Sequence, residues 1–160
     1  MEMKELDKKL NELVDFDVEH FGKFNSIDEI ENFEKEIDFK FPEDYKHFLF
    51  TYCDCAFHES TVFQLSEVSS ITNSKGQRKT GAFCGTSIMS KIGNICRAIM
   101  DDHIEIGEVG GYSLFMGMRG DRYGKIYIFA FDEDYKDGTS CFPVADSFTE
   151  LVMNTVFVDE

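Results

Sequence analysis

The spacing of apolar residues changes once along the chain, and this change constrains the fold more than any other feature. Up to Tyr52, apolar side chains recur every three or four positions, which is the period of amphipathic helices. After Asp102, the runs HIEIGEV, YSLFMGM and KIYIFAF are short, apolar or alternating, and separated by glycine-bearing turns, as in strands. Helices followed by strands and a closing helix predict an α+β domain.

Three amphipathic helices are expected before the period changes. The first spans residues 1–24 and ends at Gly22, because glycine accepts the left-handed conformation found at helix ends. The second begins after Ser26, a good N-cap, and the third begins at Pro42, which fits the first helical position. The expected apolar faces are Leu6, Leu10, Leu13, Val14, Val18 and Phe21 for the first helix, Ile27, Ile30, Phe33 and Ile37 for the second, and Tyr45, Phe48, Leu49 and Tyr52 for the third.

The middle of the chain is less regular. Residues 61–68 are expected to form a strand, and residues 72–85, which are polar and contain glycine, a loop. A fourth helix is expected from residue 86 or 87. Its apolar face would be Ile88, Ile92, Ile95 and Ile99.

The C-terminal third supplies the clearest strand and the last helix. KIYIFAF is apolar at both alternating sets of positions, so it is expected to be covered on both sides in the centre of a sheet. A closing helix is expected near Ser147, where Glu150 completes a capping box. The residues expected to face inward from it are Phe148, Leu151 and Val152.

Charge limits the possible partners. The chain has 16 Lys and Arg against 31 Asp and Glu, a formal charge of −15, which repels nucleic-acid backbones and anionic membranes and can attract a basic protein. Residues 1–60 hold 17 acids and 7 bases, net −10, and residues 61–160 hold 14 and 9, net −5. The basic cluster Lys75, Arg78 and Lys79 suggests a phosphate contact, but three charges in so acidic a chain are expected to keep a loop solvated.

The ends and the cysteines indicate a cytoplasmic, reduced protein. The N-terminal run MEMKELDKKLNELV has no apolar core of a signal peptide, and no window reaches the length of a membrane-spanning helix. Five cysteines are an odd number in a chain long enough to fold without disulfides, so free thiols are expected.

Thiol or zinc chemistry is the enzymatic alternative. Cys53 and Cys55, with His58 nearby, supply half of a tetrahedral zinc site, and no second pair of ligands follows. Cys84 precedes the expected fourth helix, whose dipole can lower a thiol pKa, but no third group marks it as a nucleophile. No phosphate-binding GxxxxGK, HExxH or GxSxG motif occurs. We therefore assign no catalytic residue, metal ligand or cofactor.

The acidic run DEDYKDG is the calcium alternative. Counted from Asp132, the sixth position is Asp137 instead of glycine, and the twelfth is Pro143 instead of a bidentate glutamate. The run is therefore expected to be a solvated hairpin turn or part of an acidic contact surface.

The stretch SIDEIENFEKEIDFKFPEDYKHFLF resembles the opening of the SUKH superfamily, the Smi/Knr-type domain. Members open with an Ile-x-x-hydrophobic-Glu helix, a Leu-Pro-x-x-aromatic step and a helix ending in Phe-Leu. The residues that match are Ile27, Ile30, Phe33, Glu34, Phe41, Pro42, Tyr45, Phe48 and Leu49. Ile106-Gly107 and SFTELV match later segments, so the resemblance spans most of residues 24–157. The family's Asn-Gly-Gly turn is replaced by DCA at residues 54–56, so the chain must bend otherwise after the third helix.

The resemblance implies a single domain of residues 1–160, with an N-terminal helix at 1–24 and a family-like core at 25–157. Its mainly antiparallel sheet would be flanked by N-terminal helices, a middle helix and a C-terminal helix, and it would hold no catalytic residue. Bacterial members look like immunity proteins that neutralise toxin domains, often nucleases, and fungal members like scaffolding regulators. We expect a non-enzymatic immunity protein with a cationic toxin as partner; the alternative is a general interaction scaffold.

Exposed acids near turns are the expected contact residues, because a nuclease is basic where it holds phosphates. They are Asp101, Asp102, Glu105, Glu108, Asp132, Glu133, Asp134 and Asp137.

Overall fold

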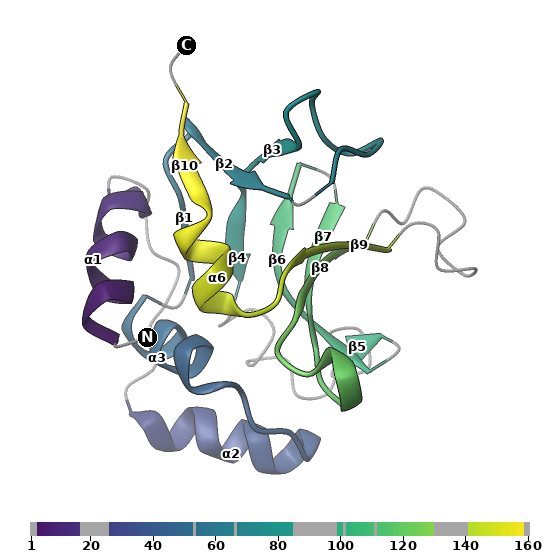
Figure 1. Ribbon diagram of the computed structural model, residues 1–160. Coiled ribbons are helices and arrows are strands. Elements are labelled where there is room, and N and C mark those ends of the chain that lie inside the picture. Colours follow the sequence, from purple (N-terminus) through teal and green to yellow (C-terminus); the bar gives the residue numbers. More distant parts are fainter. Residues whose placement is uncertain are drawn as a thin grey trace.

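The structure is a computed structural model that describes residues 3–16, 26–52, 54–65, 67–84, 99–100, 102–110, 112–129 and 141–158. Helices gather on one side of a larger sheet, and a smaller sheet stands beside it at the top of Figure 1. This is the α+β class with a mainly antiparallel sheet that the sequence predicts.

The helices flank the strands in the chain as well as in space. Helices α1 (Met3–Leu13), α2 (Ile27–Ile37) and α3 (Glu43–Thr51) come first, and α6 (Phe148–Met153) closes the chain before its last strand. The strands are β1 (Asp54–Ala56), β2 (Thr61–Gln64), β3 (Gln77–Lys79), β4 (Ala82–Cys84), β5 (Ile99–Met100), β6 (His103–Val109), β7 (Tyr112–Gly117), β8 (Ile126–Phe129), β9 (Cys141–Ala145) and β10 (Thr155–Phe157). The 3-10 turn η2 (Gly120–Arg122) lies between β7 and β8.

The larger sheet has seven strands in the order β1-β4-β6-β7-β8-β9, with β5 paired to β6. The smaller sheet has the order β10-β2-β3, and every pairing between named strands is antiparallel. Strand β8 lies between β7 and β9, and all four of its residues are buried, which confirms the predicted cover on both sides; it is an interior strand next to the edge strand β9, not the central one.

The main core lies between the helices and the inner face of the larger sheet. Phe48 of α3 is fully buried, with its ring centroid 5.1 Å from that of Phe83 on β4 and 4.7 Å from that of Phe148 on α6. The predicted apolar faces of α2, α3 and α6 are buried, except that Ile27 is 39% exposed at the first turn of α2. Ser147 caps α6 as predicted, because its hydroxyl accepts a 3.0 Å hydrogen bond from the Glu150 amide.

The first helix is shorter than the predicted 1–24. It ends at Leu13 because Val14 leaves the helix to form an antiparallel bridge with Phe57, and the Asp15 amide donates to the Ala56 carbonyl. Backbone pairing with residues 56 and 57 thus replaces the hydrogen bonds that would continue helix α1. The remaining part of that prediction, including Val18, Phe21 and Gly22, lies outside the described residues.

The predicted loop at 72–85 is wrong, because it contains the strands β3 and β4. Strand β3 has the sequence QRK, which is polar because it pairs only with β2 at the edge of the smaller sheet. The strand predicted at 61–68 ends at Gln64, and the replaced family turn is strand β1. The helix predicted from residue 86 or 87 lies outside the described residues up to residue 98, and Ile99, which is predicted on its apolar face, belongs to β5.

Glu34 fixes the link between α2 and α3. Asp38, in the left-handed region at φ 52°, ends α2 and turns the chain. The buried Glu34 carboxylate then accepts a 2.7 Å hydrogen bond from the Phe41 amide and lies 3.2 Å from the Lys46 ammonium. A buried carboxylate needs such partners, and they explain the glutamate of the family motif physically.

Candidate partner-binding surface

The face of the larger sheet that points away from the main core is the candidate surface, here called the outer face. Alternate residues of a strand point to opposite sides of a sheet. Its side chains include charged groups as well as aromatic rings, unlike the inner face. The residues are His103, Glu105 and Glu108 on β6, Ser113 and Phe115 on β7, Tyr127 and Phe129 on β8, and Cys141 on β9.

A bulge in β6 places two carboxylates side by side on this face. Residues three apart in a regular strand point to opposite faces. Glu105, however, lies opposite Phe115 and Glu108 lies opposite Ser113, and those partners are two residues apart on β7. The extra residue of the bulge is Ile106, which is 1% exposed in the main core. The bulge therefore keeps the core apolar and turns both glutamates outward.

Gly107 makes this geometry possible next to β4. A Cβ at Gly107 would lie 2.6 Å from the backbone oxygen of Ala82, far closer than atoms can approach. Ile106-Gly107 is also the pair that resembles the family's Ile-Gly segment. The structure gives each residue a reason: the isoleucine packs in the core, and the glycine lets β4 approach.

The two carboxylates differ in their surroundings. Glu108 is exposed, whereas Glu105 is partly buried. Burial raises the pKa of the Glu105 carboxyl, the nearby charge of Glu108 raises it further, and a hydrogen bond with Ser113 opposes the shift. The charged form of Glu105 is thus less favourable than that of an exposed glutamate, and a cation brought by a partner would stabilise it.

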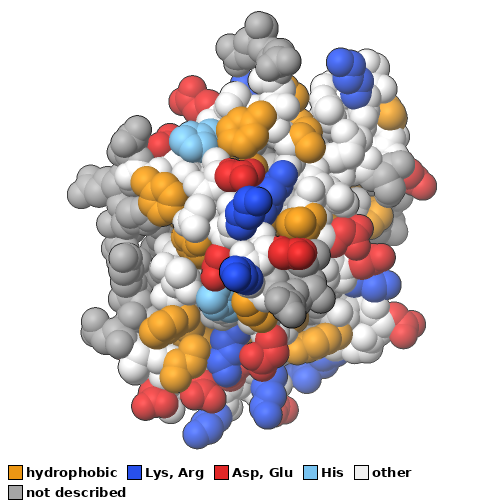
Figure 2. All heavy atoms as spheres, turned by 60° about the vertical axis from the view of Figure 1, so that its left-hand side comes forward, with side chains coloured by type: hydrophobic (Ala, Val, Ile, Leu, Met, Phe, Trp, Pro, Cys, Tyr) orange, Lys and Arg blue, Asp and Glu red, His pale blue; other side chains and the backbone are white. Residues whose placement is uncertain are grey.

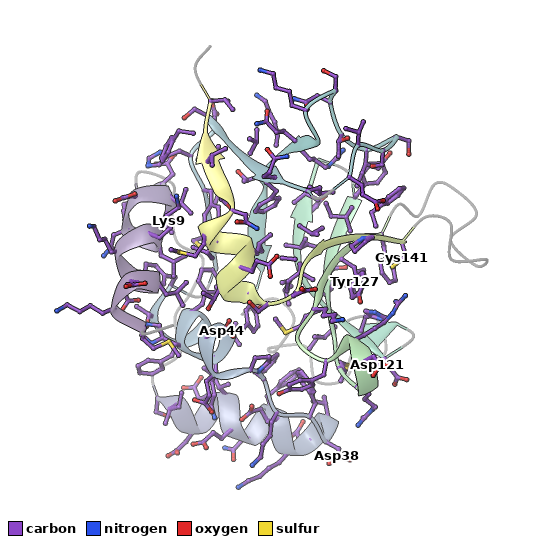
Figure 3. All side chains as sticks on the ribbon, in the orientation of Figure 1. Lys9, Asp38, Asp44, Asp121, Tyr127 and Cys141 are labelled. Atoms are coloured by element: carbon purple, nitrogen blue, oxygen red, sulfur yellow. The ribbon has the colours of Figure 1, made fainter. Side chains whose placement is uncertain are left out.

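A cation and aromatic rings occupy the other end of the outer face. The Arg122 guanidinium carbon lies 4.7 Å from the ring centre of Tyr127, and one of its amino groups donates to His103 Nε2 at 3.1 Å. Arginine only donates, so His103 Nε2 is unprotonated in this arrangement. Cys141 lies beside Tyr127 in Figure 3, with its Sγ 3.8 Å from Arg122. Burial raises the pKa of the Cys141 thiol despite Arg122, which disfavours the thiolate a nucleophile needs.

The structure places only some of the predicted contact residues. Glu105 and Glu108 share the outer face, and Asp102 is exposed just before β6, with a carboxylate oxygen 3.5 Å from Arg119 Nε. The others, Asp101, Asp132, Glu133, Asp134 and Asp137, lie outside the described residues. Their role as a contact surface stays a prediction.

The described residues do not form the arrangement of side chains that a thiol enzyme or a zinc site needs. Cys55 is buried, and His58 Nδ1 lies 3.9 Å from a carboxylate oxygen of Asp15. Cys53 and the side chain of Cys84 fall outside the described part of the chain. Over the described ranges, no three or more His, Cys, Asp or Glu side chains form a group able to hold a metal ion. Within the same ranges, no helix combines the length and apolar character needed to cross a membrane.

Sequence reasoning missed how the acids divide among the N-terminal helices. Helix α1 carries three acids and three lysines, and Figure 2 shows acidic and basic side chains interspersed on this side of the molecule. Helix α2 carries five acids (Asp28, Glu29, Glu31, Glu34 and Glu36) and one lysine, so it is net −4 whereas α1 is neutral. Counting charge helix by helix, instead of over 60 residues, reveals this from the sequence alone.

Asp44 has a structural role that the sequence does not reveal, because acids are so abundant in this chain. Asp44, at the start of α3, accepts hydrogen bonds from both the backbone amide and the hydroxyl of Thr149 at 2.8 Å, and so caps the first turn of α6 (Figure 3). Residues 105 positions apart are joined by this carboxylate. It is therefore committed to the fold.

These features describe an α+β domain whose outer face presents charge and aromatic rings. The chain belongs to the SMI1 / KNR4 family (SUKH-1), whose model matches residues 25–154. That family is generally non-enzymatic. Helix α1 precedes the matched segment, yet its Leu6, Leu10 and Leu13 are fully buried in the main core. No curated protein and no solved structure gives a significant match.

Proposed function

We propose that this protein is a non-enzymatic immunity protein that neutralises a cationic, nuclease-type toxin by binding it. The observation that carries the proposal is the pair Glu105 and Glu108, turned outward together in an acidic member of this family. The formal charge of −15 supports it further, because such a surface accelerates the approach of a basic protein.

The pair fits lysine or arginine side chains of a partner. Glu108 is exposed and can meet a cation first, and the partly buried Glu105 lies behind it beside Ser113. A cation at this site would relieve the repulsion between the two carboxylates and offset the burial of Glu105. A nuclease whose phosphate-binding cleft is occupied in this way can no longer hold its substrate.

A growth assay tests the proposal. Cells would co-express this protein with the toxin domain encoded by an adjacent gene, and the double variant Glu105→Gln, Glu108→Gln would be compared with the wild type. The matched control is Glu5→Gln, Glu12→Gln, which removes the same charge from exposed positions of α1. We expect the wild type and the control to protect the cells and the outer-face variant to protect poorly. Equal killing with and without the wild-type protein would defeat the proposal.

A general interaction scaffold is the second candidate, favoured by the family match alone. A scaffold would also bind a protein through the outer face, but that partner would not be a toxin. The absence of an adjacent toxin gene, together with a stable complex between this protein and a non-toxic partner, would favour the scaffold.

A further inference from the structure

A hollow of about 690 Å³ lies between the smaller sheet and the turn that joins β6 to β7. Its cations come from β3 and the turn before it, and its apolar residues come from three separate segments. We call it the basic hollow and define it by Lys75, Arg78 and Lys79 with Val62, Ile71 and Val158. Among the described residues that line it there is no Asp or Glu, although the chain has 31 of them.

The three cations lack carboxylate partners in the described part of the chain, where none has a carboxylate oxygen within 4.0 Å. Lys46, by contrast, lies 3.2 Å from Glu34 and 3.6 Å from Glu31. No described carboxylate therefore neutralises their positive charge, and this local field favours an anion in the hollow despite the acidity of the whole chain.

Arg78 gives the hollow a fixed wall. Its guanidinium donates to the backbone oxygens of Ile71 at 2.9 Å, Val109 at 2.8 Å and Gly110 at 3.1 Å. The guanidinium carbon also lies 4.6 Å from the ring centre of Tyr112. Neutral partners hold the group in place and leave its charge intact. Arg78 therefore joins β3 to the β6–β7 turn and keeps a positive charge in the wall of the hollow.

Lys75 and Lys79 are exposed and free to reach a ligand at the rim. Ammonium groups bind phosphate as point charges, and two of them near an arginine match a group carrying several negative charges in a small volume. Val158, which is partly exposed, offers apolar surface for an attached organic part, together with the small exposed edges of the otherwise buried Val62 and Ile71. The volume lies within the range of about 300–1,000 Å³ usual for small-molecule sites.

We propose that the basic hollow binds a small phosphorylated organic anion of nucleotide size. Its phosphates would lie between Lys75 and Lys79, and its organic part would lie against the apolar wall. A long nucleic acid is excluded as the occupant by the net charge of −15, which repels an extended backbone. The site is independent of the proposed immunity function and lies on different residues.

Calorimetric titration of the full chain tests this, with inorganic pyrophosphate and ADP as probes at constant ionic strength and with EDTA present. We expect both probes to bind, ADP more tightly because it also uses the apolar wall. Lys75→Gln, Lys79→Gln should weaken both at least tenfold. The matched control Lys4→Gln, Lys8→Gln removes two exposed lysines from α1 and should bind like the wild type.

The opposite results overturn the proposal. Absence of binding to the wild type at millimolar probe, or equal weakening in both double variants, would show that no site exists at the hollow. Pyrophosphate binding as tight as ADP binding would refute the role of the apolar wall. The thermal midpoint of each variant, which should match the wild type because the lysines are exposed, separates lost binding from lost folding.

Discussion

The two faces of the larger sheet use the same strands for different purposes. The inner face is uniformly apolar and at most 1% exposed at Ile104, Ile106, Leu114, Met116, Ile126 and Ile128. The outer face mixes a small aromatic cluster of Phe115, Tyr127 and Phe129 with the charges of Glu105, Glu108 and Arg122. The inner face packs against the helices and must therefore be apolar. The outer face does not form part of the main core, so it can hold charged side chains. Substitutions on the inner face should therefore change stability, and those at the outer carboxylates should change binding.

The largest expected effect is at the centre of the main core. Phe48→Ala should lower the free energy of unfolding by about 3–5 kcal/mol, because it removes a fully buried ring and leaves a cavity. Urea denaturation monitored by circular dichroism measures the change. A variant as stable as the wild type would contradict the placement of Phe48 in the core.

Phe129→Ala sharpens the comparison, because Phe129 is buried but belongs to the small outer cluster. Its ring lies 4.7 Å from that of Phe115 and 5.2 Å from that of His103. We expect a loss of about 3 kcal/mol, the lower end of the range for this substitution. The same denaturation experiment applies, and a loss larger than that of Phe48→Ala would reverse the ranking of the two faces.

Gly107→Ala tests the bulge that separates the faces. The new Cβ would meet the Ala82 backbone oxygen, so β4 and β6 must move apart, at a cost of about 1–3 kcal/mol typical of overpacking. The matched control is Gly120→Ala, where a Cβ meets nothing within 4 Å but φ is +61°, so any loss there reports backbone strain alone. Thermal midpoints of the two variants should show the greater loss at Gly107.

Glu105→Gln should have a small effect whose sign depends on pH. Burial raises the folded-state pKa of this carboxyl, so its stabilising contribution is complete below the unfolded pKa and is lost as pH rises through the folded pKa. The neutral glutamine avoids that loss. We therefore expect the variant to be slightly more stable than the wild type at neutral pH, by about 0.5 kcal/mol. Stability curves against pH should converge in acid, and a variant destabilised at neutral pH would contradict the assigned burial.

The smallest stability effect is expected for Glu108→Gln, because the side chain is exposed and forms no ion pair with any residue that the structure describes. Its unfolding midpoint should stay close to that of the wild type in acid and rise slightly at neutral pH, because the repulsion with Glu105 is removed. Affinity for a cationic partner should nevertheless fall, since the outermost charge of the pair is gone. Loss of stability without loss of affinity would place Glu108 with the fold instead of the binding surface.

The spacing of apolar residues was sufficient to predict the elements that pack in the core. The apolar stripes of α2, α3 and α6 and the two-sided burial of β8 follow from sequence alone, because burial there depends on apolar residues at regular spacing. Strand β3 was missed because QRK has no apolar residue to show a period, and the end of α1 was missed because it depends on a pairing with Phe57.

The sequence predicts that the candidate surface contains acids, but it does not predict which side chains lie together on one face. The acids Glu105 and Glu108 are evident in the sequence, but their spacing of three places them on opposite faces of a regular strand. Only the register with β7 shows that the bulge brings them together. In the same way, no local pattern shows that Asp44 is committed to α6, since its partner Thr149 is 105 positions away.

The most direct test of the acidic binding face is the association rate with the purified toxin domain, measured by stopped flow from low to high salt. The wild type and Glu5→Gln, Glu12→Gln should associate rapidly at low salt and slow steeply as salt rises, because exposed charges are screened. Glu105→Gln, Glu108→Gln should associate more slowly and depend less on salt. Equal rates and equal salt slopes for both double variants would contradict the account.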